Sequence, residues 1–306
     1  MMGPGIAGAL ALGGLRATIV SRTEEGASKG LESARRQLRL LADNGLIEPA
    51  EADRARELVD TSSDFEATIG RVDLVIESAP ENMEFKQNLF ARMDSIAGPN
   101  TVLASNTSGL SITAIGSRCL RPERVMTTHF WNPPHLMPLV EIVRSEKTSP
   151  DAVSAIHALL ARCGKVPVVV KKDRPGQLGN RLQMALVREA VNIVAEGIAD
   201  VEDVDLAAKS GFGMRLPVYG IFEHQDIVGL DMSMSIVDYV SRDLCNEPGA
   251  AEFYKRLVAA GNLGAKTGKG FYDWSRKSAD EVKARRDQFL IEFLRSERAK
   301  KAKASS

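Results

Sequence analysis

A histidine and a glutamate twelve residues apart are the side chains in this sequence best suited to acid–base chemistry. His129 lies near the end of Val125–Phe130, a segment expected to be a strand, and Glu141 follows it. A histidine that takes a proton from an alcohol needs a partner that fixes its tautomer and stabilises the imidazolium, and a carboxylate can do both. If the intervening loop folds back, Glu141 is that partner; otherwise His129 is a structural histidine after a strand.

The elements that would position this pair alternate between strands and helices. Alternation of this kind favours a Rossmann-type, doubly wound parallel sheet in an α/β domain. The expected strands are Ala17–Val20, Val72–Ala79, Thr101–Ser105, Val125–Phe130 and Val166–Val170, with helices at Ser28–Ala42 and Met83–Ala97 among them.

A polar break at Lys171–Gly176 ends this alternation, and helical segments alone follow it, at Leu178–Gly197, Val201–Lys209 and Asp226–Val240. We therefore expect a dinucleotide-binding domain over residues 1–172 and an all-α C-terminal domain over residues 173–306. The charged segment Glu281–Ser306 is expected to be a solvated helix that frays at its end.

Composition excludes several classes of protein. Forty Lys and Arg balance forty Asp and Glu, so the broad positive field typical of nucleic-acid binding is not expected. Apolar runs reach only about eight residues, short of the ~20 that span a bilayer, and no leader is evident, so we expect a soluble, cytoplasmic protein without a membrane partner. The three cysteines lack the spacing of a disulfide framework or a metal site, and no metal is expected.

The first residues resemble only the last part of a nucleotide-binding turn. Gly3 precedes a helix of small residues and then a strand, which is the place of the last glycine in Gly-x-Gly-x-x-Gly. The first strand and the other two glycines would lie before Met1, so a sheet ordered 3-2-1-4-5-6 would lose its middle strand. We therefore expect a marginally stable chain and a natural protein that starts upstream. Alternatively, Gly3 and Gly5 merely begin a tightly packed helix.

The residues after the strand Ala17–Val20 bear on cofactor choice. An acidic residue normally holds the adenosine ribose at this place, but Ser21 and Arg22 stand here. Arg22 could meet a 2′-phosphate, so NADP is possible beside NAD; otherwise Arg22 is a surface residue.

Six segments resemble, in order and spacing, the motifs of the L-3-hydroxyacyl-CoA dehydrogenase family. The resemblance runs from Gly3 to about Trp274, nearly the whole chain. It implies reversible, NAD-dependent oxidation of a (3S)-3-hydroxyacyl-CoA to the 3-oxoacyl-CoA, as in fatty acid metabolism. The segments are Ser105–Ser108, His129–Pro133, Leu139–Glu141, Gly179–Leu182, Asp226–Asp231 and Lys266–Tyr272.

The resemblance also implies roles for particular residues. His129 would be the catalytic base and Glu141 the carboxylate that orients it. Ser108 and Asn180 would position the reacting oxygen, Ser108 also lying against the cofactor, and Asn132 would line the substrate site. Without the family, Ser108 and Asn180 are ordinary capping residues and Asn132 is a turn residue.

On the cofactor side, the resemblance implies that Glu81, Lys86 and Lys266 contact the dinucleotide, together with Gly3, Ser21 and Arg22. Each of the three charged residues could instead be a solvated charge at a helix end. The helical hairpin after Arg22 is where the family grips CoA. The arginines at positions 35, 36 and 39 could pair with CoA phosphates or form a solvated basic face, and the family's contact positions fall near Ala34 and Leu41.

One further expectation and two alternatives follow from the sequence. The helical domain commonly mediates dimerisation in such proteins, so a homodimer is expected. One alternative keeps the fold and the histidine–glutamate pair but acts on a free hydroxy acid, such as a sugar acid or a carnitine-like compound. The other is a retired dehydrogenase that serves as a binding or structural protein.

Overall fold

The structure, a computed structural model, describes residues 2–304, which belong to two compact units. The first unit contains the chain up to Arg181 and the residues from Ala284 onward, and the second spans Leu182–Lys283. The boundary between the two units thus lies later than the break expected after residue 172. The reason is that residues after Lys172 form hydrogen bonds with the first unit. One of them joins Ser111 Oγ to Asp173 Oδ2 over 2.6 Å.

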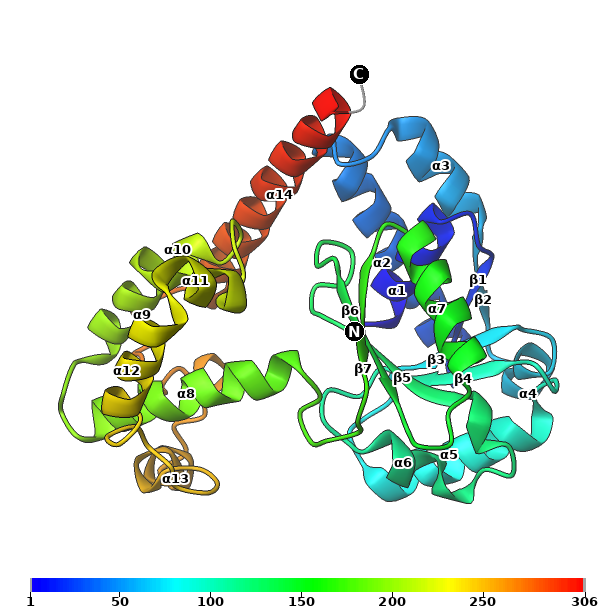
Figure 1. The fold of residues 1–306 in the computed structure, drawn as a ribbon. Helices are drawn as coiled ribbons and strands as arrows, with labels where there is room; N and C mark the ends of the chain where they lie inside the picture. Colours follow the sequence, from blue (N-terminus) through cyan, green and yellow to red (C-terminus); the bar gives the residue numbers. More distant parts are fainter. Residues whose placement is uncertain (1, 305–306) are drawn as a thin grey trace. The chain divides into compact units, whose positions relative to one another are not determined.

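The first unit is an α/β fold with two sheets (Figure 1). One sheet pairs β1 (Ala17–Val20) with β2 (Val59–Ser62) in parallel. The other has five strands in chain order: β3 (Leu74–Glu77), β4 (Val102–Ser105), β5 (Val125–Phe130), β6 (Leu139–Arg144) and β7 (Val166–Val170).

Strand direction and strand order confirm the α/β expectation and add detail. Strands β3, β4 and β5 are parallel, whereas β6 runs antiparallel to β5 and parallel to β7. Strands β1 and β3 belong to separate sheets. In a sheet ordered 3-2-1-4-5-6, the break between β1 and β3 lies at the position of strand 1.

Helices surround the sheets of the first unit and make up the second unit. The single helix expected at Asp226–Val240 is two helices that meet at Gly229, whose φ of 97° favours glycine. The helices of the first unit are α1 (Gly3–Leu12), α2 (Glu24–Asp43), α3 (Pro49–Glu57), α4 (Phe65–Ile69), α5 (Met83–Ile96), α6 (Ile112–Ile115), α7 (Pro150–Arg162) and most of α14 (Ala279–Ala304). The helices that follow β7 in the sequence are α8 (Gly179–Ala195), α9 (Val201–Ser210), α10 (Phe212–Arg215), α11 (Ile221–Val228), α12 (Leu230–Val240) and α13 (Glu252–Ala259).

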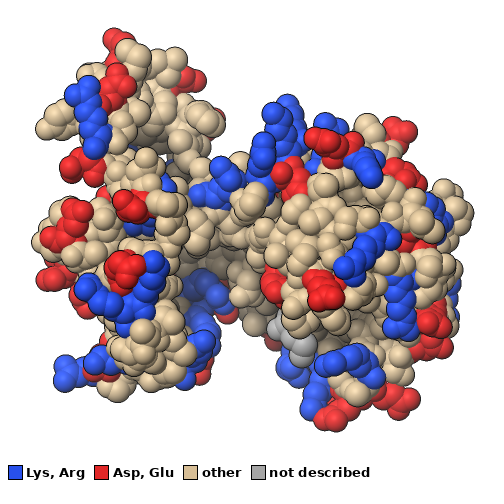
Figure 2. Space-filling view, turned by 90° about the horizontal axis from the view of Figure 1, so that it is seen from below, with Lys and Arg blue, Asp and Glu red and all other residues tan. Residues whose placement is uncertain are grey.

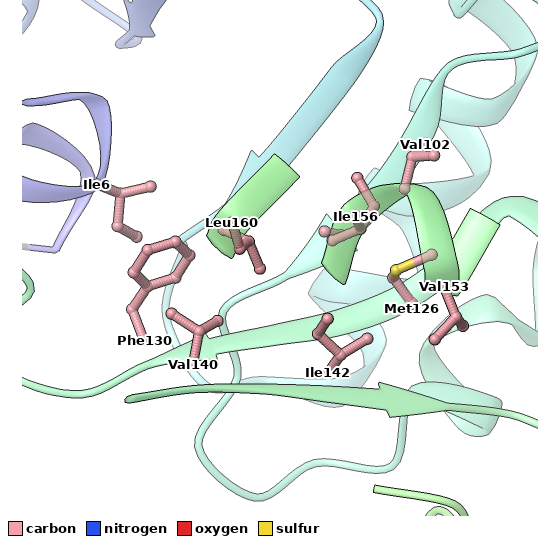
Figure 3. Packing of buried hydrophobic residues seen from close by; sticks show 10 residues of the cluster. Ile6, Val102, Met126, Phe130, Val140, Ile142, Val153, Ile156 and Leu160 are labelled. Atoms are coloured by element: carbon pink, nitrogen blue, oxygen red, sulfur yellow. The ribbon is translucent and has the colours of Figure 1, made fainter. Parts of the chain in front are cut away.

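Apolar side chains cover both faces of the five-stranded sheet. On one face, Met126 and Phe130 of β5 pack with Ile156 and Leu160 of α7 and with Ile6 of α1 (Figure 3). The opposite face packs against α5 and α6 and includes Val125, Leu103 and Phe90. Side chains alternate between the faces of a strand, so His129 lies on the α5 and α6 side, as Val125 does.

Helix α14 corrects the expectation of a solvated C-terminal tail. Its residues Leu290, Ile291 and Leu294 form an apolar cluster with Leu41 and Leu136. Nε and Nη2 of Arg295 donate to the Asn44 carbonyl at 2.9 and 2.7 Å, and Nη1 of Arg298 donates to the Leu46 carbonyl. Helix α14 therefore covers the end of α2. The last two residues of the expected tail lie outside the described residues.

The surface carries mixed charge. Figure 2 shows Lys and Arg scattered among Asp and Glu over the face in view, without a large area of one sign. Among residues 2–304, no helix combines the length and the apolar character that crossing a bilayer requires.

Candidate active site

The loop between His129 and Glu141 folds back as the sequence analysis required. Strands β5 and β6 pair antiparallel, with His129 directly opposite Glu141. His129 Nδ1 lies 2.8 Å from Glu141 Oε2, and the two side chains are 7% and 0% exposed. The sequence analysis did not identify β6 as a strand, although Leu139–Arg144 is rich in β-branched and apolar residues.

Glu141 is held as a buried carboxylate. Its Oε2 also accepts from Trp131 Nε1 at 3.0 Å, and its Oε1 accepts from the backbone N–H groups of Leu178 and Gly179 at 3.0 and 2.8 Å. Burial alone would raise the pKa of Glu141, but the hydrogen bonds from His129, Gly179, Trp131 and Leu178 outweigh it and lower the pKa below its ordinary value. Glu141 therefore stays ionised near neutral pH.

The charge of Glu141 fixes the tautomer of His129. An ionised carboxylate can only accept hydrogen bonds, so Nδ1 of His129 must donate to it. In the neutral ring, Nε2 is then the proton acceptor. Within residues 2–304, Nε2 has no hydrogen-bond partner, so it is available to a substrate hydroxyl.

Trp131 and Gly179 close the site around this pair. A Cβ atom at Gly179 would lie 2.5 Å from Cζ2 of Trp131, so the indole is seated against glycine backbone. The His129 and Trp131 rings lie 5.7 Å apart between centroids. Asn132 follows as an exposed residue with a cis bond to Pro133 and has no hydrogen bond in the described part of the chain.

Ser108 and Asn180 are in direct contact. Asn180 Nδ2 donates to the Ser108 carbonyl at 2.7 Å, and Ser108 is exposed. Neither residue caps a helix through its side chain: the cap of α6 is Ser111, whose Oγ accepts from Ala114 N, and the Asn180 amide donates. The ordinary capping interpretation is therefore wrong for both.

Glu81 supports the turn that carries Ser108. Its carboxylate accepts from Thr107 Oγ1 at 2.8 Å and from Ser108 N at 2.7 Å. Lys86 is 1% exposed, and its Nζ donates to Glu77 Oε1 at 2.6 Å and to the Ala79 carbonyl at 3.1 Å. Lys86 is thus not a solvated charge, because its buried ammonium pairs with the carboxylate of Glu77.

The remaining cofactor candidates are more scattered. Gly3 begins α1, and a Cβ there would meet no described atom within 4 Å. The tight packing expected at Gly3 is found at Gly5, where an added Cβ would lie 2.6 Å from Pro134 Cγ. Ser21 is half-buried after β1, and Arg22 is exposed. Lys266 belongs to the second unit, which is described by itself.

The residues present fit a dinucleotide along one edge of the sheets. Ser21 and Arg22 follow β1, Glu81 comes shortly after β3, and Ser108 comes shortly after β4. These are carboxyl ends of parallel strands, where open α/β sheets bind ligands. The open space at Gly3, where α1 begins, leaves room for a phosphate group.

No role in the site was expected from the sequence for four residues that contact its members, namely Glu77, Thr107, Trp131 and Gln177. The signal for Glu77 was an acidic residue directly after the apolar run Leu74–Ile76, since an acidic residue buried there needs a partner. Trp131 and Thr107 stood in the quoted motifs, but their partners depend on contacts that the chain order does not reveal.

Comparison with known proteins finds relatives along nearly the whole chain. Residues 1–174 match the family model of the 3-hydroxyacyl-CoA dehydrogenase NAD binding domain, and residues 176–274 match that of the C-terminal domain. The chain is 34% identical to 5-formyl-3-hydroxy-2-methylpyridine 4-carboxylate 5-dehydrogenase of Mesorhizobium japonicum, over 96% of this chain and 94% of that protein. It is 35% identical to mitochondrial hydroxyacyl-coenzyme A dehydrogenase of Sus scrofa, over 90% and 88%.

A solved structure extends the likeness to the fold. The crystal structure of a 5-formyl-3-hydroxy-2-methylpyridine 4-carboxylic acid 5-dehydrogenase, described as an NAD⁺-dependent dismutase, is similar with a TM-score of 0.88 and 33% identity. The match covers 96% of this chain and 94% of that one.

Proposed function

The chain belongs to the 3-hydroxyacyl-CoA dehydrogenase family, and we propose that His129 is the base of an NAD-dependent dehydrogenation at a CH–OH group. The observation that carries the proposal is the buried, ionised Glu141, which receives Nδ1–H of His129 and leaves Nε2 to accept a proton.

The reaction needs a proton and a hydride to leave the same alcohol. When bound, NAD supplies the acceptor for the hydride. Nε2 of His129 takes the hydroxyl proton while the carbonyl forms, and Glu141 stabilises the resulting imidazolium. Ser108, whose hydroxyl lies at the surface, and Asn180, which holds the Ser108 carbonyl, would position the reacting oxygen. In the reverse direction the imidazolium returns the proton.

Two substrate classes are compatible with this chemistry. The family and the Sus scrofa relative support a (3S)-3-hydroxyacyl-CoA that becomes the 3-oxoacyl-CoA, as in fatty acid metabolism. The name of the Mesorhizobium relative supports a small free carboxylate.

The packing of α14 favours the free acid. The resemblance assigns the grip on CoA to the hairpin after Arg22, near Ala34 and Leu41. Here Ala34 is 0% exposed and Leu41 is 5% exposed, and Leu41 packs with Ile291 of α14. A CoA chain laid on Leu41 would have to displace α14, and one laid on Ala34 would have to displace its neighbours in α1 and α3. We therefore propose as the substrate a small hydroxy carboxylate, or an aldehyde carboxylate that has added water to form the hydrate, which carries the CH–OH group.

A substrate panel tests this proposal. We expect NAD reduction with a free acid, tested as (S)-3-hydroxybutyrate and 5-formyl-3-hydroxy-2-methylpyridine 4-carboxylate, to be faster than with (S)-3-hydroxybutyryl-CoA, measured as kcat/KM at 340 nm. A preference for the CoA thioester would restore the first substrate class. No NADH or NADPH binding at millimolar concentration in calorimetry would instead support a retired enzyme.

We also propose that the protein is a homodimer through its second unit. Among the described residues of Leu182–Lys283, only Val191 and Ser233 are buried, while Phe222 is 84% and Val218 is 81% exposed. Apolar surface of this extent marks an interaction site.

Sedimentation equilibrium is expected to give twice the 33.2 kDa of one chain. Phe222→Glu should shift the protein toward monomer because it places a charge in the apolar surface. Leu120→Glu, at an 89% exposed leucine of the first unit, is the control and should leave the dimer intact. A monomeric parent protein would contradict the proposal.

A further inference from the structure

Gln177 has a backbone conformation that its residue type disfavours. Its φ is 56°, and it is the only residue other than glycine among residues 2–304 with a positive φ. It is also 4% exposed. Such conformations persist only where surrounding contacts enforce them, and they cluster at functional sites.

The contacts of Gln177 join two parts of the candidate site. Its Nε2 donates to the Thr107 carbonyl at 2.7 Å, and Asn180 Nδ2 donates to the next carbonyl along the chain, that of Ser108, also at 2.7 Å. Between these two side chains lie the N–H groups of Leu178 and Gly179, which bind Glu141. One short segment therefore holds the Ser108 turn on one side and the partner of His129 on the other.

The orientation of the Gln177 amide is fixed. The Thr107 carbonyl can only accept, so the nitrogen of the amide must face it. Oε1 is buried and has no partner in the described part of the chain. A side chain that pairs only one of its two polar ends, on a strained backbone, is a poor choice for stability alone.

We propose that Gln177 is a positioning residue of the reaction, which keeps Ser108 in register with the His129 and Glu141 pair through the Thr107 carbonyl. The proposal rests on the proposed function of His129. Losing the bridge lets the Ser108 turn shift relative to Nε2, and a misplacement of about 1 Å is enough to slow a reaction that depends on aligned groups.

Two variants separate this role from a purely structural one. Gln177→Met keeps the size of the side chain but removes the bridge, and Gln177→Gly removes both the bridge and the backbone strain. Gln87→Met is the matched control, because Gln87 Nε2 donates to a backbone carbonyl, that of Ala114, away from the candidate site.

The assay measures kcat and KM with NAD and the better of (S)-3-hydroxybutyrate and (S)-3-hydroxybutyryl-CoA, NADH affinity by calorimetry, and Tm. We expect both Gln177 variants to lose about tenfold in kcat, the equivalent of one hydrogen bond, with NADH affinity unchanged. Gln177→Gly should lose kcat without losing Tm, and Gln87→Met should keep its kcat.

The outcomes are distinct for the two proposals. If Gln177→Gly keeps the parent kcat, or if loss of kcat in both variants follows loss of Tm, Gln177 has only a structural role and the inference is overturned. If His129→Ala is fully active in the same assay, the proposed function fails, and the role of Gln177 fails with it.

Discussion

Replacing His129 with alanine is expected to lower kcat by about 10²–10⁴, the usual contribution of a positioned acid–base group. The variant loses the imidazole whose Nδ1 is held by the buried Glu141 and whose Nε2 is free to accept a proton. NADH affinity should change little, because His129 lies on β5 and Ser21 and Glu81 follow other strands. Stopped-flow turnover and NADH calorimetry on the same preparation measure the two effects.

A control histidine makes this prediction specific. His157 is exposed on α7, and His157→Ala should retain the parent kcat. Equal activity in the His129→Ala variant and the parent protein would sink the proposed mechanism, since the hydroxyl proton would then leave without Nε2 of His129.

Replacing Glu141 with alanine is expected to damage both stability and turnover. The change leaves His129 Nδ1, Trp131 Nε1 and the N–H groups of Leu178 and Gly179 without their acceptor in a fully buried place. Removing one partner of a buried charged network costs about 3–5 kcal/mol of unfolding free energy. We expect kcat to fall by at least the ~10²-fold contribution of acid–base catalysis, because the carboxylate that fixes the tautomer of His129 is gone.

Glutamine at position 141 isolates the effect of the charge. The folded pKa of Glu141 lies below its ordinary value of 4.5. Its contribution to stability is therefore complete above pH 4.5 and is lost as the pH falls toward the folded pKa. Urea unfolding between pH 3 and 6 should show this loss in full in the parent protein and in the exposed control Glu146→Gln, and a smaller loss in Glu141→Gln, where Asp94, whose pKa is also lowered, still titrates. Parallel curves for the parent protein and Glu141→Gln would contradict the prediction.

A chemical requirement made Glu141 the candidate partner of His129, but only the pairing of β5 with β6 brings the two side chains together. The local pattern was sufficient for Ala17–Val20 and Val125–Phe130, whose bounds the structure reproduces. Both segments are short and rich in β-branched residues, which favour strands.

What the sequence could not reveal depends on contacts between distant residues. Lys86 has the pattern of a surface charge on α5, yet it is buried because Glu77, on a neighbouring strand, supplies its counter-charge. Leu290 and Ile291 lie in a strongly charged segment, and only the position of Leu41, some 250 residues earlier, explains why they are covered. Periodicity within one segment carries no information about such partners.

The composition of the first unit from two separate stretches of chain has a consequence for synthesis. Residues 182–283 must leave the ribosome before the part of α14 that covers Leu41 and Leu46 exists. At about 5–20 residues per second, these 102 residues take roughly 5–20 s. During that time the nascent α/β unit presents the apolar end of α2 to solvent, and this surface is the one that a chaperone would need to shield until translation ends.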